Sequence, residues 1–136
     1  MMLFEKFAND FVRDRQHSIV RGDQDEIRRA LVFSLNKILS PAIRGTIEER
    51  QRQIYQEGWS ENHDDDEHCD SQLGLAAVCY ILHAAQYNED SQPIHDFWPW
   101  EWKWWKPKSV RRDLIRAAAL IIAEIERLDR LAKLEE

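Results

Sequence analysis

A chain of 136 residues suits one domain, and 43% hydrophobic residues with six tryptophans are enough to form a core. The net charge of −6 argues against a general nucleic-acid binder, because such proteins depend on neutralising phosphates. The longest apolar run, 117–123, is too short to span a bilayer. Cys69 and Cys79 would lie about 15 Å apart along one helix and could not pair. We therefore expect a soluble cytoplasmic protein with reduced cysteines and no membrane partner.

The first 40 residues predict a helical hairpin with wide apolar stripes. The first helix should stop near Gly22, and Asp23 with Glu26 form a capping pair that starts the second helix. These stripes are more than a small remainder can cover, so we expect a homodimer or a tight partner contact through this segment. The large residues of the stripes include Phe7, Phe11, Leu31 and Leu35.

Three more helices are predicted in the rest of the chain. One begins at Pro41 and ends near Glu57, the next runs from about His63 to Tyr87, and the last begins at Ser109 and reaches about Leu134. The expected inward seams are Leu73, Ala77, Tyr80 and Ala84 in the fourth helix and Leu114, Ala118, Ile121, Ile125 and Leu128 in the last. We predict an all-α bundle of about five helices in a single domain, with 1–40 as an extension of a 41–136 core.

The segment EGWSENHDDDEHCD, residues 57–70, is rich in carboxylates and histidines. Such a run often forms a solvated helix start, but extending the inward seam backwards turns Asp70, Asp66 and His63 towards the bundle. An antiparallel neighbour would place Glu49, Arg50 and Gln53 opposite Asp66, Glu67 and Asp70. Two explanations for inward carboxylates stay open: an Arg50–Asp70 ion pair, or a Mg²⁺ or Mn²⁺ site. The metal ligands would be Glu49, Asp66, Glu67 and Asp70.

Five of the six tryptophans stand between residues 98 and 105, in an expected irregular loop before the last helix. We expect Trp98, Trp100 and Trp104 to lock this loop over the bundle. The others, beside lysines, could stack a base and hold phosphate. Two arginines at the start of the last helix would be explained by an anion or by an acidic neighbour, which could be the segment 64–66. The predicted substrate-binding residues are Trp102, Trp105, Lys106, Arg111 and Arg112.

Two resemblances add to this reading. The segments ERQRQ, EGWSENHDDDEH, WPWEWKWWKP and RRDL, within 49–130, resemble a family of small uncharacterised phage and prophage proteins. More distantly, the acidic residues resemble the EExxE and ExxD motifs of MazG-like all-α nucleoside triphosphate pyrophosphohydrolases, which bind Mg²⁺ and nucleotide phosphates. The matching positions are Glu48, Glu49, Glu67 and Asp70, and Arg52 stands where the third glutamate would be.

The two functional hypotheses differ in class. The first is a nucleotide-binding phage-type protein that takes a nucleotide or small phosphorylated ligand and could hydrolyse a nucleoside triphosphate, with Glu49, Glu67 and Asp70 as catalytic residues. The alternative is a non-enzymatic interaction protein that binds or inhibits a host protein in the host cytoplasm through its Trp-rich surface. Arg52 in place of a carboxylate favours the second hypothesis.

Overall fold

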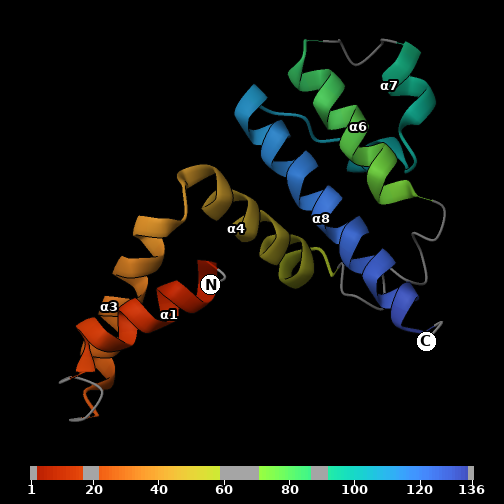
Figure 1. Cartoon of the computed structure of the whole chain (residues 1–136). Helices are drawn as coiled ribbons and strands as arrows, with labels where there is room; N and C mark the ends of the chain where they lie inside the picture. The colour runs from red at the N-terminus through yellow and green to blue at the C-terminus, as the bar shows by residue number, and fades with distance from the viewer. Residues whose placement is uncertain (1–2, 17–21, 59–70, 87–91, 135–136) are drawn as a thin grey trace. The chain divides into compact units, whose positions relative to one another are not determined.

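The computed structural model describes residues 3–16, 22–58, 71–86 and 92–134, and all regular structure in these ranges is helical. The predicted all-α class is therefore confirmed, and five α-helices of 12 residues or more match the expected bundle of about five. The chain divides into two compact units, residues 1–41 and 42–136, which are described separately (Figure 1). No helix in the described ranges has both the length and the apolar character needed to cross a membrane.

The 1–41 unit contains α1 (Leu3–Asp14) and α3 (Gln24–Ile38). The predicted start of the second helix is confirmed, since an Asp23 carboxylate oxygen accepts a hydrogen bond of 3.0 Å from the Glu26 backbone N–H. The first helix ends at Asp14, earlier than the expected position near Gly22. Leu31 and Leu35 on α3 are exposed, so the apolar stripe of this helix is not covered within the described residues.

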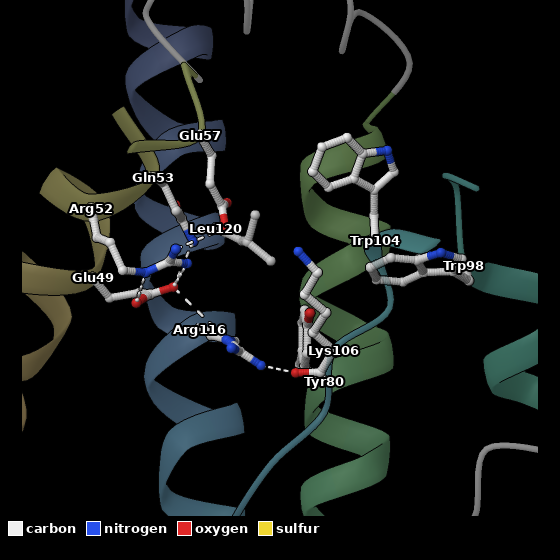
Figure 2. A pocket seen from close by; sticks show the side chains of 10 residues that line it. All are labelled: Glu49, Arg52, Gln53, Glu57, Tyr80, Trp98, Trp104, Lys106, Arg116 and Leu120. Carbon is white, nitrogen blue, oxygen red and sulfur yellow. Dashed lines mark hydrogen bonds and ion pairs between the residues drawn. The ribbon is translucent and has the colours of Figure 1, made fainter. Parts of the chain in front are cut away.

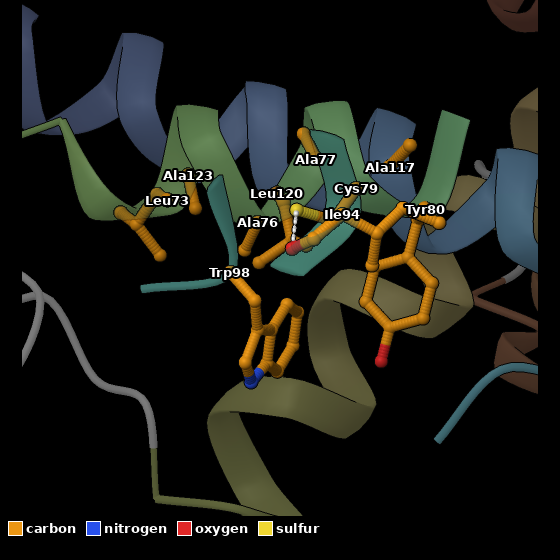
Figure 3. Packing of buried hydrophobic residues seen from close by; sticks show 10 residues of the cluster. All are labelled: Leu73, Ala76, Ala77, Cys79, Tyr80, Ile94, Trp98, Ala117, Leu120 and Ala123. Atoms are coloured by element: carbon orange, nitrogen blue, oxygen red, sulfur yellow. Dashed lines mark hydrogen bonds between the residues drawn. The ribbon is translucent and has the colours of Figure 1, made fainter. Parts of the chain in front are cut away.

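The centre of the 42–136 unit is an antiparallel pair formed by α6 (Gln72–Ala84) and α8 (Val110–Leu134). Their opposite directions follow from the hydrogen bond of 2.9 Å between His83, near the end of α6, and Asp113, near the start of α8. Small side chains let the two helices approach closely, and the expected α6 seam is buried as predicted. Figure 3 shows the core: Leu73, Ala76, Ala77, Cys79, Tyr80, Ile94, Trp98, Ala117, Leu120 and Ala123.

The segment before α8 is more ordered than the expected irregular loop. It contains a short helix, α7 (Gln92–Phe97), which packs against α6, and a 3₁₀ turn, η1 (Trp102–Trp104). The buried Ile94 fixes α7, and its carbonyl oxygen lies 3.7 Å from the Cys79 sulfur, which donates to it. These contacts give the tryptophan-rich segment a defined position on the core.

The prediction for the inward face of α8 was wrong. The large aliphatic residues of the expected seam, such as Leu114 and Ile125, are exposed. The helix instead buries a neighbouring stripe that combines small apolar residues with charged ones. The buried residues of α8 are Asp113, Ile115, Arg116, Ala117, Ala119, Leu120, Ala123 and Arg127. Close packing on α6 and ion pairs with α4 (Pro41–Gln56) decide the orientation, and neither is visible in the periodicity of α8 alone.

Candidate functional site

A buried carboxylate, Glu49 on α4, is the centre of a polar cluster between α4 and α8 (Figure 2). Arg52, one turn later on α4, forms a two-point ion pair with it, from Nε to Oε2 at 2.9 Å and from Nη2 to Oε1 at 2.8 Å. From α8, Arg112 donates to Oε2, and the Nε atom of Arg116 lies 3.9 Å from Oε1. Three guanidinium groups thus surround one carboxylate, an arrangement that compensates its loss of water.

The pKa of Glu49 reflects a balance between burial and these arginines. Burial by itself would raise the pKa, because a low dielectric disfavours the charged form. The hydrogen bond and charge of Arg52, with the charges of Arg112 and Arg116, outweigh burial and hold the pKa below its usual value of 4.5. The Glu49 hydrogen bond also raises the pKa of Arg52, which makes a second ion pair of 2.8 Å with Glu57.

Glu49 is the only predicted metal ligand that falls in the described part of the chain. The other three, Asp66, Glu67 and Asp70, lie outside the described residues. Ser71 has a left-handed backbone with φ of 59°, and α6 begins after it, so the helical phase used to turn the acidic residues inward ends at Gln72. Within the described ranges no three His, Cys, Asp or Glu side chains are grouped to hold a metal ion. The Mg²⁺ or Mn²⁺ site therefore stays a prediction.

The arginine expected to pair with the acidic segment has a partner on α8. Arg50 is buried and donates to Oε2 of Glu126, from Nη2 at 3.0 Å and from Nε at 3.2 Å. Gly45, one turn before Glu49, lies so close to α8 that an added Cβ would be 3.0 Å from Cδ1 of Ile115. Side chains of α4 that we had expected to face residues 66–70 therefore pack against α8.

Three tryptophans fix the segment before α8 to the core. Trp98 is buried, and Nε1 of Trp100 donates a hydrogen bond of 3.0 Å to the Gln72 side chain. Trp105 stacks on Tyr80 with ring centroids 4.9 Å apart and contacts Trp98 edge to face at 4.8 Å. The prediction that Trp98 and Trp100 lock the segment is consistent with this packing, whereas the third anchor is Trp105 and not Trp104.

The anchored segment presents a turn with exposed aromatic and basic side chains, which we call the tryptophan turn (residues 102–106). Trp102 and Trp104 are 44% and 40% exposed. The Nζ atoms of Lys103 and Lys106 lie 5.8 and 5.3 Å from the centroid of the Trp104 ring, within the range of a cation–π interaction. The turn thus combines large apolar rings with positive charge on an otherwise acidic protein.

The structure gathers only some of the predicted substrate-binding residues. Trp102 and Trp105 are neighbours, with ring centroids 6.3 Å apart, and Lys106 belongs to the same turn. The two arginines lie towards α4 instead: Arg112 binds Glu49, and Nη2 of Arg111 is 3.8 Å from the position of a Cβ at Gly45. Arg112 thus has an acidic neighbour in Glu49, whereas the neighbour that the sequence suggested, the segment 64–66, lies outside the described residues.

Sequence reasoning missed two groups of this site. Arg116 donates to the Lys106 carbonyl, which ties the tryptophan turn to the Glu49 cluster. Asp113 is fully buried and accepts hydrogen bonds from the Lys108 backbone N–H at 2.8 Å and from His83. Arg116 follows Asp113 by three residues and Arg112 by four, a spacing that indicates one polar face of the helix. The aliphatic pattern of α8 was the stronger signal, so this polar face was not recognised.

A cavity of about 20 Å³ lies where the polar cluster meets the aromatic residues (Figure 2). Its walls include Glu49, Arg52, Tyr80, Trp104 and Lys106. This volume is enough for about one water molecule, whereas sites for small organic ligands usually measure about 300–1,000 Å³. The cavity as it stands does not accommodate a nucleotide.

The chain was compared with models of protein families, with curated proteins and with solved structures, and none of these comparisons gave a match.

Proposed function

We propose that the protein is a non-enzymatic interaction protein that binds an acidic surface of another protein through the tryptophan turn. The observation that supports this most directly is the exposure of Trp102 and Trp104 on a segment whose other tryptophans are packed into or against the core. Large exposed aromatic side chains are uncommon on monomers and are the residues that dominate protein interfaces. The resemblance to phage proteins makes a host protein the natural partner.

Preorganisation supports the proposal. Trp98, Trp100 and Trp105 hold the backbone of the turn, so a partner would meet it in a fixed position. Fixing a binding surface before association lowers the entropy lost on binding. Rigid aromatic anchors of this kind contribute large contact area for few rotatable bonds.

The charge of the turn indicates the character of the partner. Lys103 and Lys106 stand over the Trp104 ring, and Lys108 follows in the same segment. Lys103 also forms an ion pair of 2.9 Å with Glu101, so Lys106 and Lys108 supply the excess positive charge, whereas the whole chain carries a net charge of −6. A local positive region on an acidic protein attracts an acidic surface and orients the approach. We therefore expect the association rate to fall with salt concentration.

The ion pairs of Glu49 with arginines argue against catalysis as the main role of the protein. Both of its carboxylate oxygens accept hydrogen bonds from arginines, so a divalent cation would have to displace guanidinium groups and then lie beside them. The small size of the cavity next to this carboxylate also argues against catalysis. Neither observation concerns residues 59–70, on which the metal hypothesis also depends.

Nucleotide binding is the second candidate, because Arg52, Arg116 and Lys106 line the same small cavity as Tyr80 and Trp104. Cations beside aromatic rings are the groups that recognise phosphates and bases. In this proposal the tryptophan turn moves to admit the ligand. Mg²⁺-dependent hydrolysis to a monophosphate and pyrophosphate would be its enzymatic form and would require Glu67 and Asp70.

One set of variants tests both candidates. Trp104→Ala and the Lys103→Glu, Lys106→Glu double variant change the turn, and Tyr55→Ala, an exposed aromatic residue of α4, is the control. Affinity capture from host lysate should retain a partner on the wild type and on Tyr55→Ala and lose it on both turn variants. Titration with nucleoside triphosphates, with and without Mg²⁺, should leave tryptophan fluorescence unchanged. Mg²⁺-dependent quenching that Trp104→Ala abolishes would instead support nucleotide binding.

A further inference from the structure

Helix α8 buries three charged residues and leaves a row of large aliphatic residues exposed. Asp113, Arg116 and Arg127 are buried, whereas Ile121 and Ile125 are 42% and 52% exposed. Large aliphatic side chains gain the most from leaving water, and a helix that exposes a whole row of them normally buries that row against something else. No described residue of the 42–136 unit covers this row, so within that unit the α6–α8 pair presents an uncovered apolar face.

The row has the spacing of a helix-to-helix contact. Leu114, Ala118, Ile121, Ile125 and Leu128 follow one another at intervals of four, three, four and three residues, which is the alternation of a heptad seam. A sustained seven-residue repeat favours a partner helix that runs along the whole row. The row alone therefore predicts that the covering element is a helix.

Helix α6 extends this face. Leu75, Val78 and Ile81 are exposed and recur every three residues along α6. On α8 the exposed row lies about 100° from Ile115, the residue that faces Gly45 of α4. By helical phase, each row points away from the side of the helix pair that α4 contacts. We call these residues the outer face: Leu75, Val78, Ile81, Leu114, Ile121, Ile125 and Leu128.

We propose that the outer face binds the outer face of a second copy of the chain, related by a two-fold axis near Ile121, so that the two helix pairs form a four-helix homodimer. The seam is nearly symmetric about this residue, with Leu114 seven positions before it and Leu128 seven after it. Two antiparallel copies therefore place Leu114 against Leu128 and Ile121 against itself. Such self-complementarity is what a two-fold interface requires.

The charges beside the seam and the area of the outer face are both consistent with a second copy of the chain as the partner. Arg111 lies three residues before the seam and Asp129 one residue after it, so antiparallel pairing brings the Arg111 of each copy near the Asp129 of the other. Helices of 25 and 13 residues, each about 10 Å wide, present a footprint of about 600 Å², or about 1,200 Å² for two copies. That area exceeds the roughly 1,000 Å² expected of a specific interface.

Sedimentation equilibrium on the full chain tests the proposal. The wild type should be a dimer. Ile121→Glu should raise its dissociation constant by about 100-fold or more, because the two carboxylates would meet on the axis in an apolar contact. Ile47→Glu on α4, where the native side chain is 41% exposed, is the matched control and should leave the dimer intact. Leu31→Glu tests the competing prediction of a dimer through the 1–41 unit and should also have no effect.

Two further measurements separate loss of the interface from loss of folding. An equimolar mixture of Ile121→Glu and Ile121→Lys should recover a dimer, since opposite charges meet on the axis. In a Cys69→Ser background, Ile121→Cys should form an intermolecular disulfide and Ile47→Cys should not. Cys79 does not interfere, because it is buried and burial raises its pKa to about 11. A monomeric wild type, or a dimer that Leu31→Glu dissociates and Ile121→Glu does not, would overturn the proposal.

Discussion

Arg52 pairs with Glu49 through two hydrogen bonds, of 2.8 and 2.9 Å, from the position where the resemblance to pyrophosphohydrolases would place a third carboxylate. The substitution therefore does more than remove a candidate metal ligand. It supplies a guanidinium that binds both carboxylate oxygens of Glu49, another candidate metal ligand, and also pairs with Glu57. The cluster is thus organised as a set of ion pairs between α4 and α8, with a structural role that can be measured directly.

We predict that Glu49→Gln will lower the free energy of unfolding by about 3 kcal/mol, because it leaves three arginines near a buried site without their common counter-charge. The adjacent and exposed Glu48 provides the control, and Glu48→Gln should change stability by no more than about 0.5 kcal/mol. Urea denaturation followed by circular dichroism measures both. Equal stability of the two variants would show that the ion pairs of Glu49 with the arginines do not stabilise the fold.

Acid should destabilise the protein through the same residue. The pKa of Glu49 is lower in the folded state than its ordinary value of 4.5, so the unfolded state binds more protons and stability increases with pH across this range. The contribution is complete above about pH 4.5 and is lost as the pH falls through the folded-state pKa. Denaturation midpoints between about pH 3 and 6 should show a smaller pH dependence in Glu49→Gln than in Glu48→Gln.

Two neighbouring tryptophans should behave differently on truncation. Trp105→Ala should lower the free energy of unfolding by about 2–4 kcal/mol, because Trp105 stacks on Tyr80 and contacts Trp98. Trp104→Ala removes a side chain with far less packing and should cost less than about 1 kcal/mol. Thermal and urea unfolding would compare the two. If Trp104→Ala were the more destabilising variant, the assignment of Trp105 as the anchor would be wrong.

The close approach of α4 to α8 can be tested with two glycines. Gly74→Ala in α6 should raise stability by about 0.5–1 kcal/mol, because alanine favours the helix and nothing lies within 4 Å of the new Cβ. Gly45→Ala should gain less or lose stability, since its Cβ would be 3.0 Å from the Ile115 side chain. A gain at Gly45 as large as that at Gly74 would contradict the close contact.

Local sequence signals determined much of the architecture. Helical periodicity and the scarcity of glycine and proline predicted an all-α chain, the capping pair at Asp23 and Glu26 predicted the start of α3, and Pro41 predicted the start of α4. These features depend on interactions between residues three or four apart, which a sequence displays directly. The inward seam of α6 was predictable for the same reason.

Tertiary structure decided which of several compatible faces is used. Helix α8 carries two adjacent stripes, and the stripe that is buried is the one that contains Arg116, which lies beside Glu49 together with the neighbouring Arg112. The choice of Trp105 over Trp104 as an anchor likewise depends on Tyr80, a residue of another helix. Pairings between distant residues arise only when helices pack, because periodicity fixes the direction of each side chain around its own axis and not the partner it will meet.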